Sequence, residues 1–306
     1  MYKKFFGLKE NPFNVNPDPR FLYQTREIEE ALACLKYGVE HRKGFVLLTG
    51  EVGTGKTTLL NKLLEGLRQS RVATAFIFNP RLSANQFLQF TMGDFGIACE
   101  SRMKSQILLH LNQWLLEKYR NGETAALIVD EAQNLSLEVL EEIRLLTNLE
   151  TATEKLLQIV LSGQPELESL INQPALRQLR QRITLRCRMI PLSLEQTQGY
   201  IAERLHIAGA DGEPIFEAAA IEAVFRFSRG IPRVINLLCE HALITSYAEE
   251  RKPVVAQTVE GVAHDFELDR AFVPRTAPVP AAPSGAQFGG SFDSLGELMD
   301  RMRKSG

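Results

Sequence analysis

The stretch FVLLTGEVGTGKTTLLNKL, residues 45–63, decides the fold. Its first six residues, Phe45–Gly50, are almost wholly apolar and have the length of a strand buried on both faces of a parallel sheet. The residues that follow Lys56 have the apolar spacing of an amphipathic helix. Between strand and helix, residues 50–57 match the phosphate-binding pattern G-x-x-x-x-G-K-[ST] at every fixed position, in the context that this motif requires.

This loop predicts ATP and Mg²⁺ as ligands. Its glycines let successive backbone N–H groups converge on the β-phosphate, helped by the positive end of the helix. Lys56 is expected to reach the β- and γ-phosphates, and the Thr57 hydroxyl to bind Mg²⁺. A glycine-rich turn that contains Lys-Thr by chance is disfavoured by the three glycines and the flanking elements. The predicted nucleotide-binding residues are Gly50, Glu51, Val52, Gly53, Thr54, Gly55, Lys56, Thr57 and Thr58.

A second acidic element follows the apolar run of residues 125–129. Asp130 is expected to hold Mg²⁺ through water, and Glu131 to activate the attacking water as a general base. Adjacent carboxylates after a strand are often plain solvated caps, so the pair alone is a weak signal. Together with the loop at residues 50–57, it predicts nucleotide hydrolysis rather than binding alone.

Strand and helix patterns alternate along the first two thirds of the chain, which predicts an α/β fold with a parallel sheet sandwiched by helices. Further strands are expected at 72–78 and 156–163, and a short one near 185–191. Helical patterns dominate from Ser193 onward. The expected parts are an extended N-terminal arm (1–26), an α/β core (27–192), a small all-α lid (193–272), a flexible Pro/Ala/Gly-rich linker (273–290) and a short amphipathic helix (291–306).

The last segment has one apolar helical face, formed by Leu295, Leu298, Met299 and Met302. We predict that this face docks a partner or a neighbouring subunit, and a disordered tail is the alternative.

The composition limits the class of protein. The chain has 306 residues, 44% of them hydrophobic, and a formal net charge of -2, which excludes a wholly disordered chain and gives no overall polyanion-binding signature. The four cysteines and five histidines show no metal-ligand spacing, which disfavours a zinc site. We find neither a signal-peptide pattern nor an apolar run of about 20 residues, which predicts a cytoplasmic chain without a transmembrane segment.

Several motifs together resemble one family over residues 1–265. They are FFGLKENPFNVNPDPRFLY, the loop GEVGTGKTT, VDEAQNL, LQIVLSGQPEL, LRQLRQRI and the Gly230-Ile231-Pro232-Arg233 turn. They are similar to the AAA+ ATPases of the ExeA/GspA group, which serve secretion pathways and include relatives in MSHA pilus biogenesis. The resemblance implies a P-loop AAA+ core with a lid, and an ATP-dependent homo-oligomer that forms a ring. It also implies a protein partner in a secretion or pilus envelope machinery, which would hold the chain at the inner membrane.

The resemblance also implies roles for residues outside the phosphate-binding loop. Gln164 would be sensor 1, beside the γ-phosphate, and Arg233 in the lid would be sensor 2. Asn79 would pair with Glu131 in the nucleotide-free state. Arg182, or Arg180, would be the arginine finger that reaches the γ-phosphate of a neighbouring subunit. Each of these residues also has a plain interpretation as a turn or solvent-facing side chain.

Tyr23 is expected near the adenine, and the phenylalanines of the arm are expected to dock on its own sheet or on a neighbouring subunit.

Three functions compete. The leading hypothesis is an oligomerising ATPase that drives assembly of a secretion or pilus system. The second is a DNA-bound ATPase that regulates transposition, like TniB and MuB, in which the five arginines of residues 177–188 would line a basic channel. The third is a nucleotide-dependent scaffold with negligible turnover, which Glu131 disfavours. Family members that continue into a membrane span and a peptidoglycan-binding domain differ from this sequence, which shows neither feature.

Overall fold

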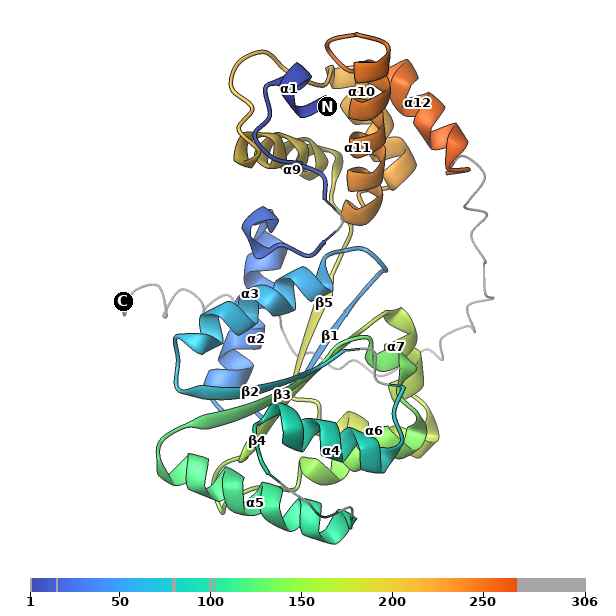
Figure 1. Cartoon of the computed structure of the whole chain (residues 1–306). Helices are drawn as coiled ribbons and strands as arrows, with labels where there is room; N and C mark the ends of the chain where they lie inside the picture. The colour runs from blue at the N-terminus through green and yellow to red at the C-terminus, as the bar shows by residue number, and fades with distance from the viewer. Residues whose placement is uncertain (1, 15, 79–80, 99–100, 102, 269–306) are drawn as a thin grey trace. The chain divides into compact units, whose positions relative to one another are not determined.

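The computed structural model describes residues 2–14, 16–78, 81–98, 101 and 103–268. These residues form a parallel sheet of five strands in the order β2-β3-β4-β1-β5 (Figure 1). The strands are β1 Phe45–Gly50, β2 Val72–Ile77, β3 Thr124–Val129, β4 Leu157–Gly163 and β5 Leu185–Met189. The predicted parallel α/β fold is therefore confirmed, and β1 lies between β4 and β5.

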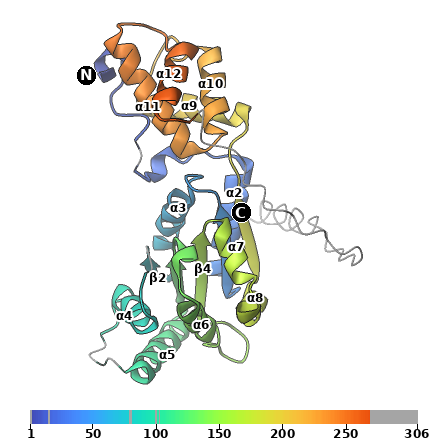
Figure 2. The same ribbon diagram turned by 90° about the vertical axis from the view of Figure 1, so that its right-hand side faces the viewer.

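Side chains alternate across the sheet, and both of its faces are buried. On β1, Phe45 and Leu47 join one apolar cluster, whereas Val46 and Leu48 join another on the opposite face. Helices α2 (Arg26–Glu40) and α3 (Lys56–Arg68) cover the face of Val46 and Leu48. The other face is covered by α4 (Ala84–Asp94), α5 (Lys104–Arg120), α6 (Leu137–Leu146), α7 (Pro165–Ile171) and α8 (Arg177–Arg182) (Figure 2). Burial on both faces explains why β1, β3 and β4 have nearly continuous apolar sequences, whereas the edge strand β5 exposes Arg186 and Arg188.

Four helices follow the sheet in sequence and share a separate apolar cluster. They are α9 (Leu194–Ile207), α10 (Ala218–Ser228), α11 (Pro232–Ala248) and α12 (Ala256–Asp265). The chain enters this group past a tight contact between Leu192 and Gly230, in which the Leu192 N–H donates to the Gly230 carbonyl at 2.8 Å. Gly230 has φ +74°, and a Cβ added there would lie 1.9 Å from the Leu192 oxygen. Glycine is therefore required where the chain passes from the sheet to helices α9–α12, which we call the lid helices.

The N-terminal arm packs into the core of the lid helices. It begins with a short helix, α1 (Tyr2–Phe6), where the sequence predicted an extended segment. The ring of Phe13 is fully buried and meets Phe216 edge to face, with centroids 6.1 Å apart. The Tyr2 hydroxyl donates to the carboxylate of Glu240 at 2.8 and 2.9 Å. The phenylalanines Phe5, Phe6 and Phe13 of the arm thus pack with helices α9–α12 of their own chain, and not on the sheet.

Some predicted features lie outside the described residues. They are Asn79, the linker at 273–290, and the C-terminal segment at 291–306 with Leu295, Leu298, Met299 and Met302. Among the helices that the structure describes, none is long and apolar enough to cross a membrane.

Candidate active site

The phosphate-binding loop connects the end of β1 to the start of α3. Gly53 and Gly55 have φ values of +80° and +97°, a backbone that favours glycine, and Gly55 caps α3. The Thr54 hydroxyl donates to the carbonyl of Glu51 at 2.8 Å and braces the turn. The first N–H groups of α3 therefore follow directly on a tightly curled backbone, which is the arrangement that binds phosphate at a helix N-terminus.

Lys56 lies inside this loop and is 5% exposed. Its ammonium group donates to the carbonyls of Gly50 and Glu51 at 2.8 and 2.9 Å. Burial lowers the pKa of Lys56, and the negative charges of Glu131 and Asp130 oppose this shift. Lys56 therefore holds the loop closed on itself and keeps a cation at its centre.

Asp130 follows β3 and is 2% exposed. Its Oδ2 accepts a hydrogen bond from the Thr57 hydroxyl at 2.6 Å, and its Oδ1 accepts one from the Ser162 hydroxyl at 2.8 Å. Strand register explains the contact with Ser162: Val129 pairs with Leu161 on β4, so the two strands end side by side. A buried carboxylate beside a hydroxyl is an oxygen donor set that suits Mg²⁺, which keeps most of its waters and binds few protein oxygens.

Glu131 is held by two glutamine side chains. Its backbone has φ +53°, a left-handed conformation that is uncommon for a residue with a side chain. Its Oε2 accepts hydrogen bonds from Gln133 Nε2 at 2.5 Å and from Gln164 Nε2 at 3.2 Å. The structure thus brings Gln164, which caps α7 after β4, into contact with Glu131.

Lys56, Thr57 and Glu131 border one cleft of about 320 Å³. Its floor is the loop from Val52 to Thr58 together with Glu131, and its other walls come from the arm and the lid. Arg233, at the start of α11, lines the cleft, and its backbone N–H donates to the Gly53 carbonyl at 3.1 Å. Tyr23 also lines it and meets the ring of Tyr200 edge to face. Arg233 as sensor 2 and Tyr23 at the adenine stay predictions, and both residues lie at the cleft.

The two candidate arginine fingers lie elsewhere. Arg180 and Arg182 are exposed on α8, and neither lines the cleft of its own chain. Arg182 donates to the side chain of Asn148 at 3.1 Å, and Arg180 to that of Asn172 at 3.5 Å. Their predicted role depends on a second subunit.

Sequence reasoning missed two residues that contact the predicted site and one that lines the cleft. Gln133 and Ser162 contact Glu131 and Asp130, as described above. Arg204 on α9 is 4% exposed and donates to Asn236 at 2.8 Å, with its guanidinium 4.7 Å from the centre of the Phe21 ring. Burial lowers the pKa of Arg204. In the sequence, Gln133 belongs to the DEAQ motif, which indicates a place near Asp130 and Glu131. Arg204 lies in an ordinary helical pattern, which gives no indication that it lines the cleft.

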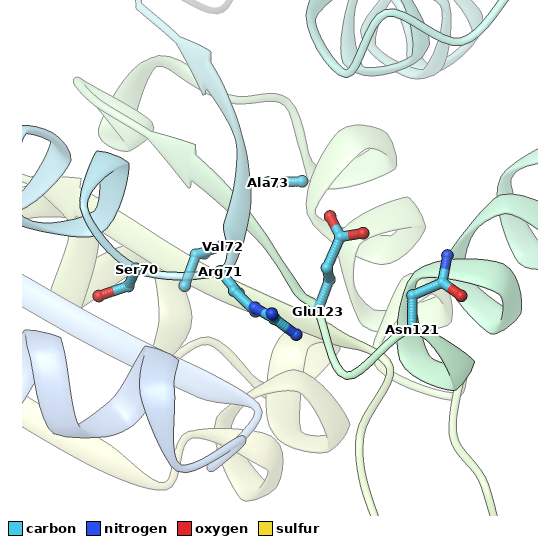
Figure 3. A pocket seen from close by; sticks show the side chains of 6 residues that line it. All are labelled: Ser70, Arg71, Val72, Ala73, Asn121 and Glu123. Carbon is cyan, nitrogen blue, oxygen red and sulfur yellow. The ribbon is translucent and has the colours of Figure 1, made fainter.

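A second hollow, of about 240 Å³, lies where β2 begins and just before β3. It is lined by Ser70, Arg71, Val72, Ala73, Asn121 and Glu123 (Figure 3). These residues stand at the amino ends of the strands, whereas ligands of open α/β sheets bind at the carboxyl ends. The cleft at the phosphate-binding loop is therefore the candidate active site.

Comparison with known proteins agrees with this fold and this loop. Residues 39–171 match the family described as AAA domain. Over 266 residues the chain is 44% identical to General secretion pathway protein A of Aeromonas hydrophila. The aligned region covers 87% of this chain and 48% of that protein. The chain therefore spans about half the length of this relative. The resemblance predicted from the motifs is confirmed.

Solved structures share the fold at low identity. The ORC2 protein of Aeropyrum pernix, in its ADPNP and ADP complexes, superposes with a TM-score of 0.63 at 16% identity, covering 84% of this chain and 72% of that one. The ORC1 protein of Aeropyrum pernix in complex with DNA gives a TM-score of 0.64 at 15% identity, covering 85% and 70%. These likenesses confirm the P-loop AAA+ fold.

Proposed function

We propose that this chain, which carries an AAA domain and is related to General secretion pathway protein A, binds ATP with Mg²⁺ and hydrolyses it. One observation carries the proposal: the loop that follows β1 and the Glu131 side chain, which follows β3, line one cleft. The segments that follow these two strands bring together the buried cation of Lys56, the Thr57–Asp130 pair and the carboxylate of Glu131. This is the combination of charges that a nucleoside triphosphate and its hydrolysis require.

Binding exchanges contacts within the loop for contacts to phosphate. Lys56 now donates to two carbonyls of its own loop, and phosphate oxygens are stronger acceptors for an ammonium group. The N–H groups at the start of α3 add further donors. Thr57 and Asp130 would hold Mg²⁺, which when bound neutralises negative charge on the phosphate oxygens.

Hydrolysis requires a base at the γ-phosphate end of the cleft. Glu131 lines the cleft, and as a carboxylate it would accept the proton of the attacking water as the new oxygen–phosphorus bond forms. Gln164 contacts Glu131 and would act as sensor 1 through this carboxylate. Arg233 at the lid side of the cleft would clamp the γ-phosphate and couple its loss to movement of the lid.

Substitution of Lys56 tests the binding step. We expect Lys56→Ala to bind ATP about 10- to 100-fold more weakly, because it loses hydrogen bonds from a charged donor to phosphate. Equilibrium binding of a fluorescent ATP analogue in MgCl₂, repeated in EDTA, measures the effect. Lys62→Ala, on the same helix, is the control, because Lys62 pairs with Glu65 and lies outside the cleft. Equal affinity of Lys56→Ala and wild type contradicts the proposal.

At the level of the cell, we infer that ATP turnover drives assembly of a secretion or pilus envelope machinery. The relationship to General secretion pathway protein A supports this inference. The chain would act as an ATP-dependent homo-oligomer, in which Arg182 or Arg180 on α8 of one subunit would reach the cleft of the next. A partner in the envelope would then hold it at the inner membrane.

A second candidate function, DNA binding, is favoured by one surface feature. Five exposed arginines lie on α8 and on the edge strand β5. Over the residues that the structure describes, none of the five forms a salt bridge. They are Arg177, Arg180, Arg182, Arg186 and Arg188. Arg186 and Arg188 alternate along β5 on the same side of the strand. Guanidinium groups in a row suit a phosphate backbone.

A salt titration tests this candidate. If these arginines contact DNA phosphates, the affinity for duplex DNA should fall steeply with salt. Arg186→Ala with Arg188→Ala should then reduce the log–log slope by about 0.9 for each phosphate that the variant no longer neutralises. Gel shifts at a series of salt concentrations, with and without MgATP, measure this slope. Arg26→Ala, an exposed arginine paired with Glu30 on α2, is the control. Absence of a shift at low salt excludes this function.

A further inference from the structure

The carboxylate of Glu131 belongs to a closed ring of hydrogen bonds with Gln133 and Gln164. Gln133 Nε2 and Gln164 Nε2 both donate to Oε2 of Glu131, at 2.5 and 3.2 Å. Gln133 Oε1 in turn accepts the backbone N–H of Gln164 at 3.1 Å. We call Gln133 and Gln164 the glutamine clamp. Because each member of the ring is held by another, the rotation of the Glu131 carboxylate is fixed.

The two oxygens of Glu131 are treated differently. Both amides of the glutamine clamp donate to Oε2, whereas Oε1 has no hydrogen-bond partner among the residues that the structure describes. Glu131 lines the cleft, but Gln133 and Gln164 do not. A general base needs one oxygen accessible to water and a defined direction toward it. The two hydrogen bonds to Oε2 hold one oxygen of the carboxylate in place and leave Oε1 to accept a hydrogen bond from water.

The backbone next to the clamp is shaped to admit Gln133. A Cβ added at Gly163, the last residue of β4, would lie 2.7 Å from Gln133 Oε1 and 2.8 Å from Leu167 Cδ2. The absence of a side chain at Gly163 thus lets Gln133, in the turn that follows β3, reach the end of β4. Gln133 is half-buried, which is consistent with a fixed rather than a solvent-facing amide.

We propose that Gln133 is a positioning residue for hydrolysis: with Gln164 it holds Oε2 of Glu131 so that Oε1 faces the attacking water. This inference rests on the proposed function, since it assigns Gln133 a part in the same reaction. Gln133 acts through Glu131 and makes no contact with the cleft itself. It should therefore affect the rate of the chemical step and leave nucleotide affinity unchanged.

Two variants of Gln133 test the proposal. Gln133→Glu keeps the size of the side chain but replaces the donor by a second carboxylate, and Gln133→Ala removes the side chain. We expect kcat for MgATP to fall about 10- to 100-fold in both, with KM and the Kd of a fluorescent ATP analogue within about twofold of wild type. Gln106→Glu, at an exposed position of α5, makes the same chemical change away from the site.

A double variant separates positioning from simple damage to the fold. If the glutamine clamp acts as one unit on Glu131, Gln133→Ala with Gln164→Ala should lower kcat by much less than the product of the two single effects. Multiplicative effects, or a fall in kcat with matching losses in affinity and melting temperature, overturn the proposal in favour of a structural role.

The outcomes also separate this proposal from the function on which it rests. If wild type hydrolyses ATP, Glu131→Gln does not, and the Gln133 variants keep the wild-type kcat, the glutamine clamp alone is wrong. If purified wild-type protein neither retains nor hydrolyses ATP in Mg²⁺, both proposals are wrong.

Discussion

Glu131→Gln should bind MgATP as tightly as wild type and hydrolyse it about 10²- to 10⁴-fold more slowly, the range of a general base. The amide has the size of the carboxylate but cannot accept a proton from water. The substitution leaves unchanged the residues that carry the binding contacts, which are Lys56, Thr57 and Asp130. Single-turnover hydrolysis of labelled ATP gives the rate, and equilibrium binding gives the affinity.

Glu138→Gln is the matched control, because Glu138 is an exposed carboxylate in the first turn of α6. It should hydrolyse ATP at the wild-type rate. The same Glu131→Gln protein, sized with and without MgATP, should reveal an oligomer if the nucleotide binds at a subunit interface, because nucleotide that is not hydrolysed would stay bound there. If Glu131→Gln retains the wild-type rate, Glu131 is not the base. If wild type binds ATP but shows no turnover, the scaffold hypothesis replaces hydrolysis.

The chemistry of the cleft was predictable because most of it is local. Eight consecutive residues, Gly50–Thr57, form the phosphate-binding loop, and strand–loop–helix patterns around them are visible in the sequence. Asp130 and Glu131 follow another apolar strand, and the carboxyl ends of parallel strands lie at one edge of the sheet. Gln164 comes directly after β4, so the same rule places it at this edge of the sheet, where it contacts Glu131.

Contacts between distant parts of the chain were not predictable. Phe13 packs on Phe216, and Tyr2 bonds to Glu240, so the arm completes the core of a domain that begins about 190 residues later. Apolar residues in a Pro- and Asn-rich segment show that the arm docks, but they do not show where. The hydrogen bond from the Gln164 backbone N–H to Gln133 Oε1 was not predictable for the same reason. It depends on the small size of Gly163 at the end of β4.

The position of α8 leads to a second prediction with a large expected effect on ATP hydrolysis, which concerns Arg182. Arg182 is exposed, is held by Asn148 beyond α6, and lies outside the cleft of its own chain. An exposed arginine held in one orientation on the surface is suited to enter the cleft of a neighbouring subunit, where its planar donors match the charge of the transferring phosphoryl group. If this proposal is right, the active site is complete only between two copies of the chain, joined head to tail as in a ring.

Arg182→Ala is then expected to lower kcat by about 10³-fold, the lower end of the range for an arginine finger, while each subunit still binds ATP. Wild-type activity per subunit should rise with protein concentration as the oligomer forms. Steady-state ATP hydrolysis over a range of protein concentrations measures both effects. Arg177→Ala, at another exposed arginine of α8, is the control and should keep wild-type turnover.

A mixing experiment distinguishes an arginine supplied by a neighbour from one that acts within its own subunit. Arg182→Ala has intact clefts, and Glu131→Gln has intact arginines, so each is inactive alone but they complement each other across an interface. Random mixing in equal amounts should recover about a quarter of wild-type activity, because about one interface in four joins an Arg182→Ala cleft to a Glu131→Gln arginine. Subunits that exchange but recover no activity would show that Arg182 does not act in trans. Recovery with Arg180→Ala in place of Arg182→Ala, and not with Arg182→Ala itself, would assign the finger to Arg180.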